Sequence, residues 1–95
     1  MNLGITQPTL IECFGIAVRQ SREARGWSQE QLAEHSNLNR SYVGEIERGR
    51  AIASLATVEK LALALGVSPS TLVGRGEAVR HSNRVRGISL MAIAC

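Results

Sequence analysis

A cluster of side chains suited to recognising a nucleic acid lies mid-chain, in the run Asn39 to Tyr42 and at Glu45, Arg48 and Arg50. A guanidinium group can donate two hydrogen bonds to O6 and N7 of guanine, and a carboxylate can accept one from N4 of cytosine. A tyrosine can place its ring against a thymine methyl group or donate its hydroxyl to a phosphate. These residue types indicate recognition of double-stranded DNA.

Two short helices are predicted to position this cluster, and the first begins at Ser28. The Ser28 hydroxyl can cap the helix while Gln31 reaches back to the cap residue, which is the reciprocal pattern of a capping box. Ala33 faces inward and is small enough to let a second helix cross closely. Asn37 follows at the sharp turn, because asparagine tolerates a left-handed backbone better than most residues.

The second predicted helix is capped by Asn39 and stopped by Gly49. Val43 and Ile46 lie three positions apart and face inward, so the polar cluster points away from the core. The run Asn39 to Tyr42 occupies the N-terminal end of this helix, where a recognition helix meets base edges in the major groove. The two helices together form a helix-turn-helix signature.

Three further helices complete a predicted all-α fold. The first begins near Thr9 or Leu10 and is closed by Gly26, with apolar residues recurring three and four positions apart. The fourth helix is capped by Ser54 and ended by Gly66. Its predicted inward face comprises Leu55, Val58, Leu61, Ala62 and Leu65.

The ends of the chain are predicted to lie outside the bundle. The expected divisions are an arm over residues 1–9, a helical domain over residues 10–73 and an extension over residues 74–95. Pro69 starts a short fifth helix, and Val73–Asn83 follows as a linker with two glycines. The apolar segment Ile88–Cys95 is open to three readings: a strand, a helix docked on the bundle, or an element exchanged in a dimer.

Composition supports one small domain with extensions. The chain has 95 residues, and 44% hydrophobic content with 3% aromatic residues suits a helical bundle with an aliphatic core. The net charge is +3, but six arginines and one lysine balance seven glutamates up to Leu72, so the whole surplus follows that residue. For DNA binding, the direction in which the arginine side chains point therefore matters more than the net charge.

Enzymatic, metal-binding and membrane-spanning roles find no support in the sequence. The chain contains no aspartate, and neither Cys13 nor Cys95 lies near a cluster of histidines, so we expect no catalytic site, metal centre, cofactor or disulfide. No apolar run is long enough to span a membrane, and no signal peptide is evident because the first cationic side chain is Arg19. We expect a cytoplasmic protein.

The stretch from Phe14 to Leu72 resembles the lambda/434 repressor-Cro type of helix-turn-helix domain, the XRE family, which folds as a compact five-helix bundle. The matching residues are Arg19, Arg22, Gly26, Trp27, Ser28, Gln29, Leu32, Ala33, Val43, Ile46, Glu47, Arg48, Gly49, Ser54, Leu55, Leu65, Gly66, Val67 and Ser68. Asn37 and Ala53 depart mildly from the family pattern, which often has glycine and proline there. Residues 36–49 also resemble the controller proteins of restriction-modification systems.

The resemblance implies roles for five residues. Arg40 and Ser41 match the family's base-reading positions, and Gln29 matches a glutamine that holds a phosphate with the help of backbone N–H groups. Arg22 and Glu47 match an arginine and a glutamate that pair inside the bundle, so we expect a structural ion pair.

The candidate site therefore has two groups of residues. The predicted base-reading residues are Arg40, Ser41, Tyr42 and Glu45, and the predicted phosphate-binding residues are Gln29, Asn39, Arg48 and Arg50. Tyr42 can equally pack over the end of the preceding helix, and Asn39 can act as a helix cap alone. Arg48 and Arg50 flank Gly49, where they can contact phosphates across the groove.

The resemblance implies a sequence-specific, double-stranded DNA-binding transcriptional regulator encoded by a bacterium or phage. We expect a homodimer on an inverted repeat, because one recognition helix reads few base pairs and two half-sites multiply affinity and specificity. Two alternatives remain open. One is an antitoxin that holds a toxin through its C-terminal segment, and the other is a protein-protein interaction module that does not bind DNA.

Overall fold

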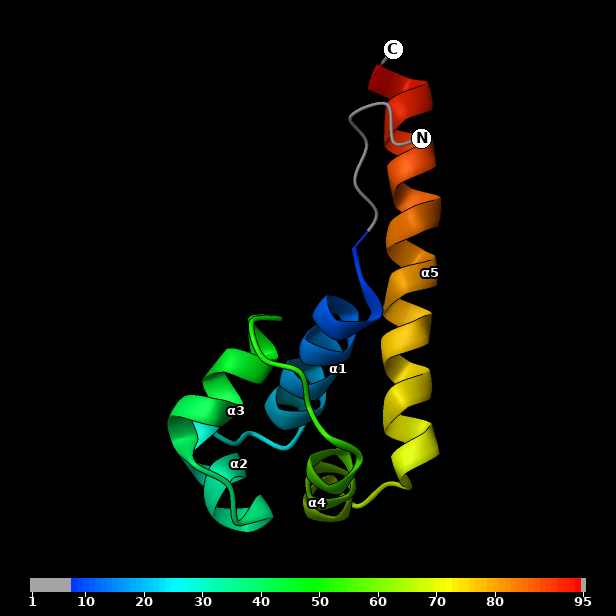
Figure 1. The fold of residues 1–95 in the computed structure, drawn as a ribbon. Coiled ribbons are helices and arrows are strands. Elements are labelled where there is room, and N and C mark those ends of the chain that lie inside the picture. The colour runs from blue at the N-terminus through cyan, green and yellow to red at the C-terminus, as the bar shows by residue number, and fades with distance from the viewer. Residues whose placement is uncertain (1–7, 95) are drawn as a thin grey trace.

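The described part of the chain folds into five helices joined by short turns (Figure 1). The computed structural model describes residues 8–94, and it describes side chains for residues 8–82. The helices are α1 (Leu10–Ala24), α2 (Gln29–Ser36), α3 (Arg40–Glu47), α4 (Leu55–Leu65) and α5 (Pro69–Ala94). No strand occurs within residues 8–94, so the predicted all-α, five-helix architecture is confirmed.

The predicted caps of α2, α3 and α4 are confirmed. Ser28 and Gln31 form the reciprocal capping box at the start of α2. At α3, Asn39 Oδ1 accepts a hydrogen bond from the backbone N–H of Ser41 at 2.8 Å. The Ser54 hydroxyl caps α4 in the same manner. Each cap satisfies backbone N–H groups that the first helical turn leaves without partners.

The turn between α2 and α3 is left-handed at Asn37, as predicted. Its φ is 56°, and no other non-glycine residue in the described part of the chain has a positive φ. The N–H of Leu38 then donates to the carbonyl oxygen of Ala33 at 2.9 Å, which closes the end of α2. This turn redirects the chain so that α3 packs against α2.

The core forms around α1, which contacts α3, α4 and α5, while α2 contacts α3 and α4. Its buried side chains are Phe14, Val18, Leu32, Ala33, Val43, Ile46, Val58, Leu61, Ala62, Leu65 and Leu72. All but one of these are aliphatic, as the composition predicted. Every helix contributes to this cluster, so no pair of helices has a complete core without the others.

α1 and the C-terminal end of α3 approach so closely at Gly15 that no side chain fits between them. A β-carbon there would overlap the carbonyl oxygen of Ile46 and lie 2.9 Å from that of Glu47. Glycine in a helix costs about 1 kcal/mol relative to alanine, so this position is occupied by glycine at a local cost. The missing side chain sets how deeply α3 sits against α1.

α5 differs from the sequence prediction, which placed a linker over Val73–Asn83. That prediction is wrong, because α5 continues as one helix to Ala94. Leu72 and Gly76 are buried one helical turn apart, and a β-carbon at Gly76 would lie 3.0 Å from Cα of Phe14. Gly76 therefore permits contact between α5 and α1 rather than marking a break.

The second half of α5 extends beyond the other helices (Figure 1, orange to red). Its helical conformation to Ala94 removes the strand alternative for residues 88–94 of the apolar segment Ile88–Cys95. The contacts of that segment fall outside the described side chains. Most of the predicted N-terminal arm, residues 1–7, also lies outside the described residues.

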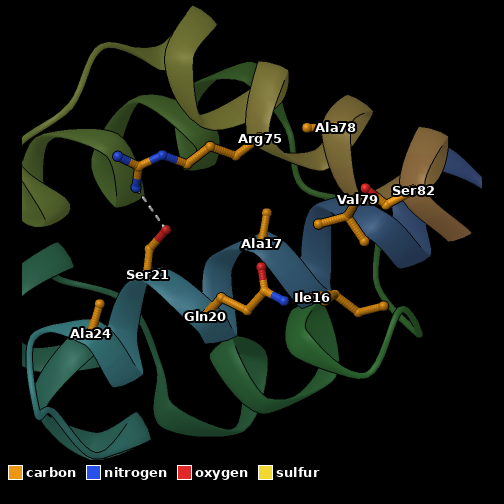
Figure 2. A pocket seen from close by; sticks show the side chains of 9 residues that line it. All are labelled: Ile16, Ala17, Gln20, Ser21, Ala24, Arg75, Ala78, Val79 and Ser82. Carbon is orange, nitrogen blue, oxygen red and sulfur yellow. Dashed lines mark hydrogen bonds between the residues drawn. The ribbon is translucent and has the colours of Figure 1, made fainter.

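A groove runs between α1 and the first half of α5 (Figure 2). Small residues, including Ala17 and Ala78, line it. Arg75 spans the groove and donates a hydrogen bond from Nη1 to Ser21 Oγ at 2.9 Å. This bond adds a polar link between α5 and α1 to their apolar contact.

The predicted inward face of α4 is wrong at one position, because Leu55 is 86% exposed. Leu55 is the first residue of α4 and follows directly after the Ser54 cap. The buried face begins two residues later, at Thr57 and Val58, and continues through Leu61. An apolar residue in the first turn of a helix need not reach a core that lies against its later turns.

We predict that Gly15→Ala lowers the free energy of unfolding by about 2–3 kcal/mol or more, because overpacking forces backbone shifts. Urea denaturation followed by circular dichroism measures the change. Gly74→Ala is the matched control, since a β-carbon at Gly74 meets nothing within 4 Å. This variant should be stabilised by about 0.4–1 kcal/mol. Equal stability of the two variants would contradict the close-approach argument.

Candidate nucleic-acid interface

A buried carboxylate, that of Glu47, lies behind the candidate interface with only 2% of its side chain exposed. Arg22 donates to both of its oxygens, from Nε to Oε2 at 2.8 Å and from Nη2 to Oε1 at 3.1 Å. Gln29 Nε2 donates to Oε1 at 2.9 Å. The remaining Arg22 nitrogen, Nη1, donates to the carbonyl oxygen of Trp27 at 2.7 Å. We refer to Arg22, Gln29 and Glu47 as the carboxylate network.

The carboxylate network joins three elements at one point. Arg22 belongs to α1, Gln29 is the first residue of α2 and Glu47 is the last residue of α3. Hydrogen bonding to Glu47 raises the pKa of Arg22, so the guanidinium keeps its charge at every physiological pH. The network therefore fixes the N-terminal end of α2 against α3, with the geometry of a bidentate ion pair.

The outer side of Gln29 opens onto a shallow concavity between α2 and α3. The residues lining it are Gln29, Arg40, Ser41, Gly44, Glu45 and Arg48. The structure thus brings together five of the eight sequence-predicted contact residues in one place. Arg40 and Ser41 are exposed in the first turn of α3. An amide NH₂ group has two donors, so Gln29 keeps one for an outside acceptor while the other serves Glu47.

Arg48 and Glu45 form an exposed ion pair within this concavity, from Nη2 to Oε2. A β-carbon at Gly44 would lie 3.2 and 3.3 Å from the two terminal nitrogens of Arg48, so the guanidinium lies over the backbone of α3. The hydrogen bond from Arg48 is the main reason that the pKa of Glu45 lies below its ordinary value. Glu45 is therefore ionised near neutral pH and keeps the Arg48 guanidinium in this ion pair.

The other three predicted residues lie around the concavity rather than in it. The Tyr42 hydroxyl lies 3.3 Å from Thr57 Oγ1 and 3.4 Å from the carbonyl oxygen of Ile52, so it is directed toward the start of α4. Asn39 uses its side-chain oxygen to cap α3. Arg50 is exposed directly after α3.

Sequence reasoning missed a stacked arrangement beside the start of α2. The rings of Trp27 and His35 stack with their centroids 4.2 Å apart and an angle of 8° between their planes. The guanidinium of Arg25 lies 5.0 Å from the Trp27 ring centroid and donates to the carbonyl oxygen of Leu65 at 3.0 Å. No local pattern signals this arrangement, because Trp27 precedes α2 and Leu65 ends α4.

The described residues contain no group of three or more histidine, cysteine, aspartate or glutamate side chains that could hold a metal ion. Among the same residues, no helix is both long and apolar enough to cross a membrane.

Residues 18–72 match a family model described as helix-turn-helix. The immunity repressor protein of Bacillus phage phi105 is 42% identical to the chain over 67 residues, which cover 70% of this chain and 46% of that protein. Control protein C.BamHI of Bacillus amyloliquefaciens is 46% identical over 61 residues, or 63% of this chain and 75% of that protein. The chain thus spans about half the length of the phage repressor.

Two crystal structures share the fold. The clp gene regulator ClgR from Corynebacterium glutamicum has a TM-score of 0.86 and 26% identity, covering 93% of this chain and 94% of that one. The restriction-modification controller protein C.Esp1396I, as a tetramer in complex with its natural 35 base-pair operator, has a TM-score of 0.70 and 26% identity. That match covers 77% of this chain and 96% of that chain.

We predict that Arg22→Met lowers the free energy of unfolding by about 3–5 kcal/mol, because it leaves the buried Glu47 carboxylate without its charge partner. Urea denaturation at fixed protein concentration measures this loss. The double variant Arg22→Met with Glu47→Met should recover much of the stability, since no buried charge remains. A single-variant loss below about 1 kcal/mol, the value of an exposed pair, would show that the network is not structural.

Proposed function

Because the chain belongs to the helix-turn-helix family, whose model matches residues 18–72, we propose that it is a sequence-specific, double-stranded DNA-binding transcriptional regulator. The observation that carries the proposal is the concavity that places Gln29 of α2 beside Arg40, Ser41 and Arg48 of α3. One surface thus offers donors for a phosphate next to side chains suited to base edges. No enzymatic activity is proposed.

The phosphate contacts are proposed to come from both helices. Gln29 offers its second amide hydrogen beside the N-terminal end of α2, where backbone N–H groups favour an anion. Arg48 reaches the same concavity from the end of α3, and Arg50 follows on the exposed side. These positions give an electrically neutral bundle a locally cationic face. Asn39 is proposed to act mainly as the α3 cap.

The base contacts are proposed to come from the exposed side of α3. Arg40 and Ser41 lie in its first turn, and Glu45 follows one turn later. The remaining candidate, Tyr42, has its hydroxyl directed toward Thr57 in the free protein. A base contact by Tyr42 therefore requires either the ring edge alone or the loss of that link.

Operator binding is supported by what is known of the relatives. C.Esp1396I was crystallised on its natural operator, and the phage phi105 protein is an immunity repressor. We therefore place the proposed action on bacterial or phage DNA in the cytoplasm. The antitoxin alternative receives no support from these relatives, which are a repressor, a gene regulator and control proteins.

We further propose that two copies pair through the projecting half of α5. The helix continues past the bundle (Figure 1), and its last residues, 88–94, include a single polar residue, Ser89. An apolar helix end without a partner is unfavourable in water, and a second copy supplies an identical apolar surface. Pairing would also present two α3 helices to two half-sites of an inverted repeat.

We predict that Arg40→Ala relaxes base preference at one position per half-site, because a bidentate arginine contributes about 1–3 kcal/mol of discrimination. Arg50→Ala should instead weaken binding to all sequences similarly. The measurement is selection of duplexes from a random library by each variant, followed by sequencing and titration. An unchanged preference after replacing both Arg40 and Ser41 would refute the base-reading assignment.

The same titrations distinguish a DNA-binding regulator from a protein-protein interaction module that does not bind DNA. Binding to DNA should weaken linearly in log salt, with a slope of about −0.9 per phosphate contact. A wild-type protein that selects no duplex and shows no salt dependence would refute the proposed function.

We predict that Leu90→Asp dissociates the homodimer, because it places a charge in the proposed apolar interface. Sedimentation equilibrium at micromolar concentration should give the monomer mass for this variant and the dimer mass for the wild type. His81→Asp is the matched control, since it adds a carboxylate at an exposed position of the same helix and should leave the mass unchanged. A wild-type monomer, or dissociation by both variants, would contradict pairing through this segment.

A further inference from the structure

We propose that Glu45 determines DNA sequence specificity through its ion pair with Arg48. A phosphate that binds Arg48 must break this pair, and only a cognate base gives Glu45 a hydrogen bond in its place. The inference rests on the proposed DNA-binding function and assigns the selection step to one pair of residues. Glu45 accepts a hydrogen bond from a cognate base, and in the free protein it also pairs with Arg48. Its effect is to weaken binding to sites that offer it no hydrogen-bond donor.

Arg48 already lies where a phosphate contact would be made. Its guanidinium lies over Gly44, whose missing side chain leaves room for it. A β-carbon at Gly44 would lie 3.5 Å from Gln29 Oε1, so Arg48 and the Gln29 amide flank the same point. The Gln29 amide and the Arg48 guanidinium are therefore adjacent, and a phosphate between them could accept from Arg48 and from the second hydrogen on Gln29 Nε2.

Glu45 and a phosphate compete for the same donors on Arg48. Glu45 Oε2 accepts from Arg48 Nη2, one of the terminal nitrogens that an arginine uses to hold a phosphate. A phosphate that takes Arg48 leaves an ionised carboxylate facing the DNA backbone. Like charges in that arrangement repel and disfavour the complex.

Arg48 is the main partner of Glu45 in the free protein. Arg50 also attracts the carboxylate, but it acts through charge at a longer range than the hydrogen bond from Arg48. The neighbouring Glu47 is buried and fully engaged by Arg22 and Gln29, so it does not take part. The Glu45–Arg48 pair is thus separate from the carboxylate network.

A cognate base pair can restore the hydrogen bond that Glu45 loses when Arg48 turns to a phosphate. The N4 amino group of cytosine in the major groove donates to a carboxylate. Both members of the pair are accessible for this exchange, since their side chains are 42% and 50% exposed. A site with a suitable amino group therefore satisfies Glu45 while Arg48 holds a phosphate. A site without one leaves Glu45 unsatisfied.

The experiment compares Glu45→Gln with the wild type on two probes. One is a random-sequence duplex of about 30 base pairs, long enough for two half-sites, and the other is a duplex of that length selected by the wild-type protein. Glu59→Gln removes the same charge from an exposed position on α4 and serves as the matched control. Fluorescence anisotropy at fixed salt gives the affinity of each variant for each probe.

Glu45→Gln should bind the random duplex about 2- to 5-fold more tightly than Glu59→Gln does, the range expected for releasing an exposed ion pair. Its affinity for the selected duplex should stay equal or fall, so the ratio of specific to random binding decreases. In an Arg48→Gln background, Glu45→Gln should give no gain beyond that of Glu59→Gln. The carboxyl pKa of Glu45, followed by NMR, should rise in Arg48→Gln.

Two outcomes would overturn the inference alone. One is an equal gain by Glu45→Gln on both duplexes, which is the result of general charge removal. The other is a gain that persists in the Arg48→Gln background. Failure of the wild type to select any duplex is a different result, because it overturns the proposed function as well.

Discussion

The buried carboxylate of Glu47 is the constraint on which the candidate interface depends. A carboxylate removed from water is stable only when donors surround it, and here the donors come from Arg22 and Gln29. Satisfying this charge therefore requires α1, the start of α2 and the end of α3 to meet at one point. The orientation of α2 relative to α3 follows from that requirement. Gln29 serves both sides, because its amide bonds the buried charge inward and faces the concavity outward.

The parts of the fold that the sequence predicts correctly are decided by neighbouring residues. Ser28 and Gln31 complete a cap within one helical turn, so their types and spacing are sufficient. The linker over Val73–Asn83 was predicted wrongly because its glycines carry a local signal for a break. Gly76 instead faces the backbone of Phe14, and that contact is made by a residue near the other end of the chain. Contact between distant segments outweighs local propensity there.

In the candidate site, too, some features follow from neighbouring residues and others depend on the three-dimensional packing. The exposure of Arg40 follows from the helical period of α3, and residue type then suggests its partner. The Glu45–Arg48 pair depends on rotamers and on the bare backbone of Gly44, which residue spacing does not specify. Tyr42 illustrates the same limit, since only the position of Thr57 on α4 decides where its hydroxyl points. Sequence thus predicts which helix faces outward more readily than which side chains on it are already engaged.

The charge distribution explains why pairing of Arg48 with Glu45 affects the affinity of this protein for DNA. Positive and negative residues balance up to Leu72 and the surplus of +3 follows on α5, so the part of the chain that carries the candidate interface has no net charge to attract DNA at long range. Its affinity must come from short-range contacts made after arrival, and an arginine paired with a glutamate contributes less to non-specific binding than a free one. A weak single contact surface then favours two linked surfaces, because the second half-site binds at a high effective concentration. The proposed pairing of two copies and the proposed exchange at Arg48 would both serve selectivity, because neither depends on a strong general attraction to DNA.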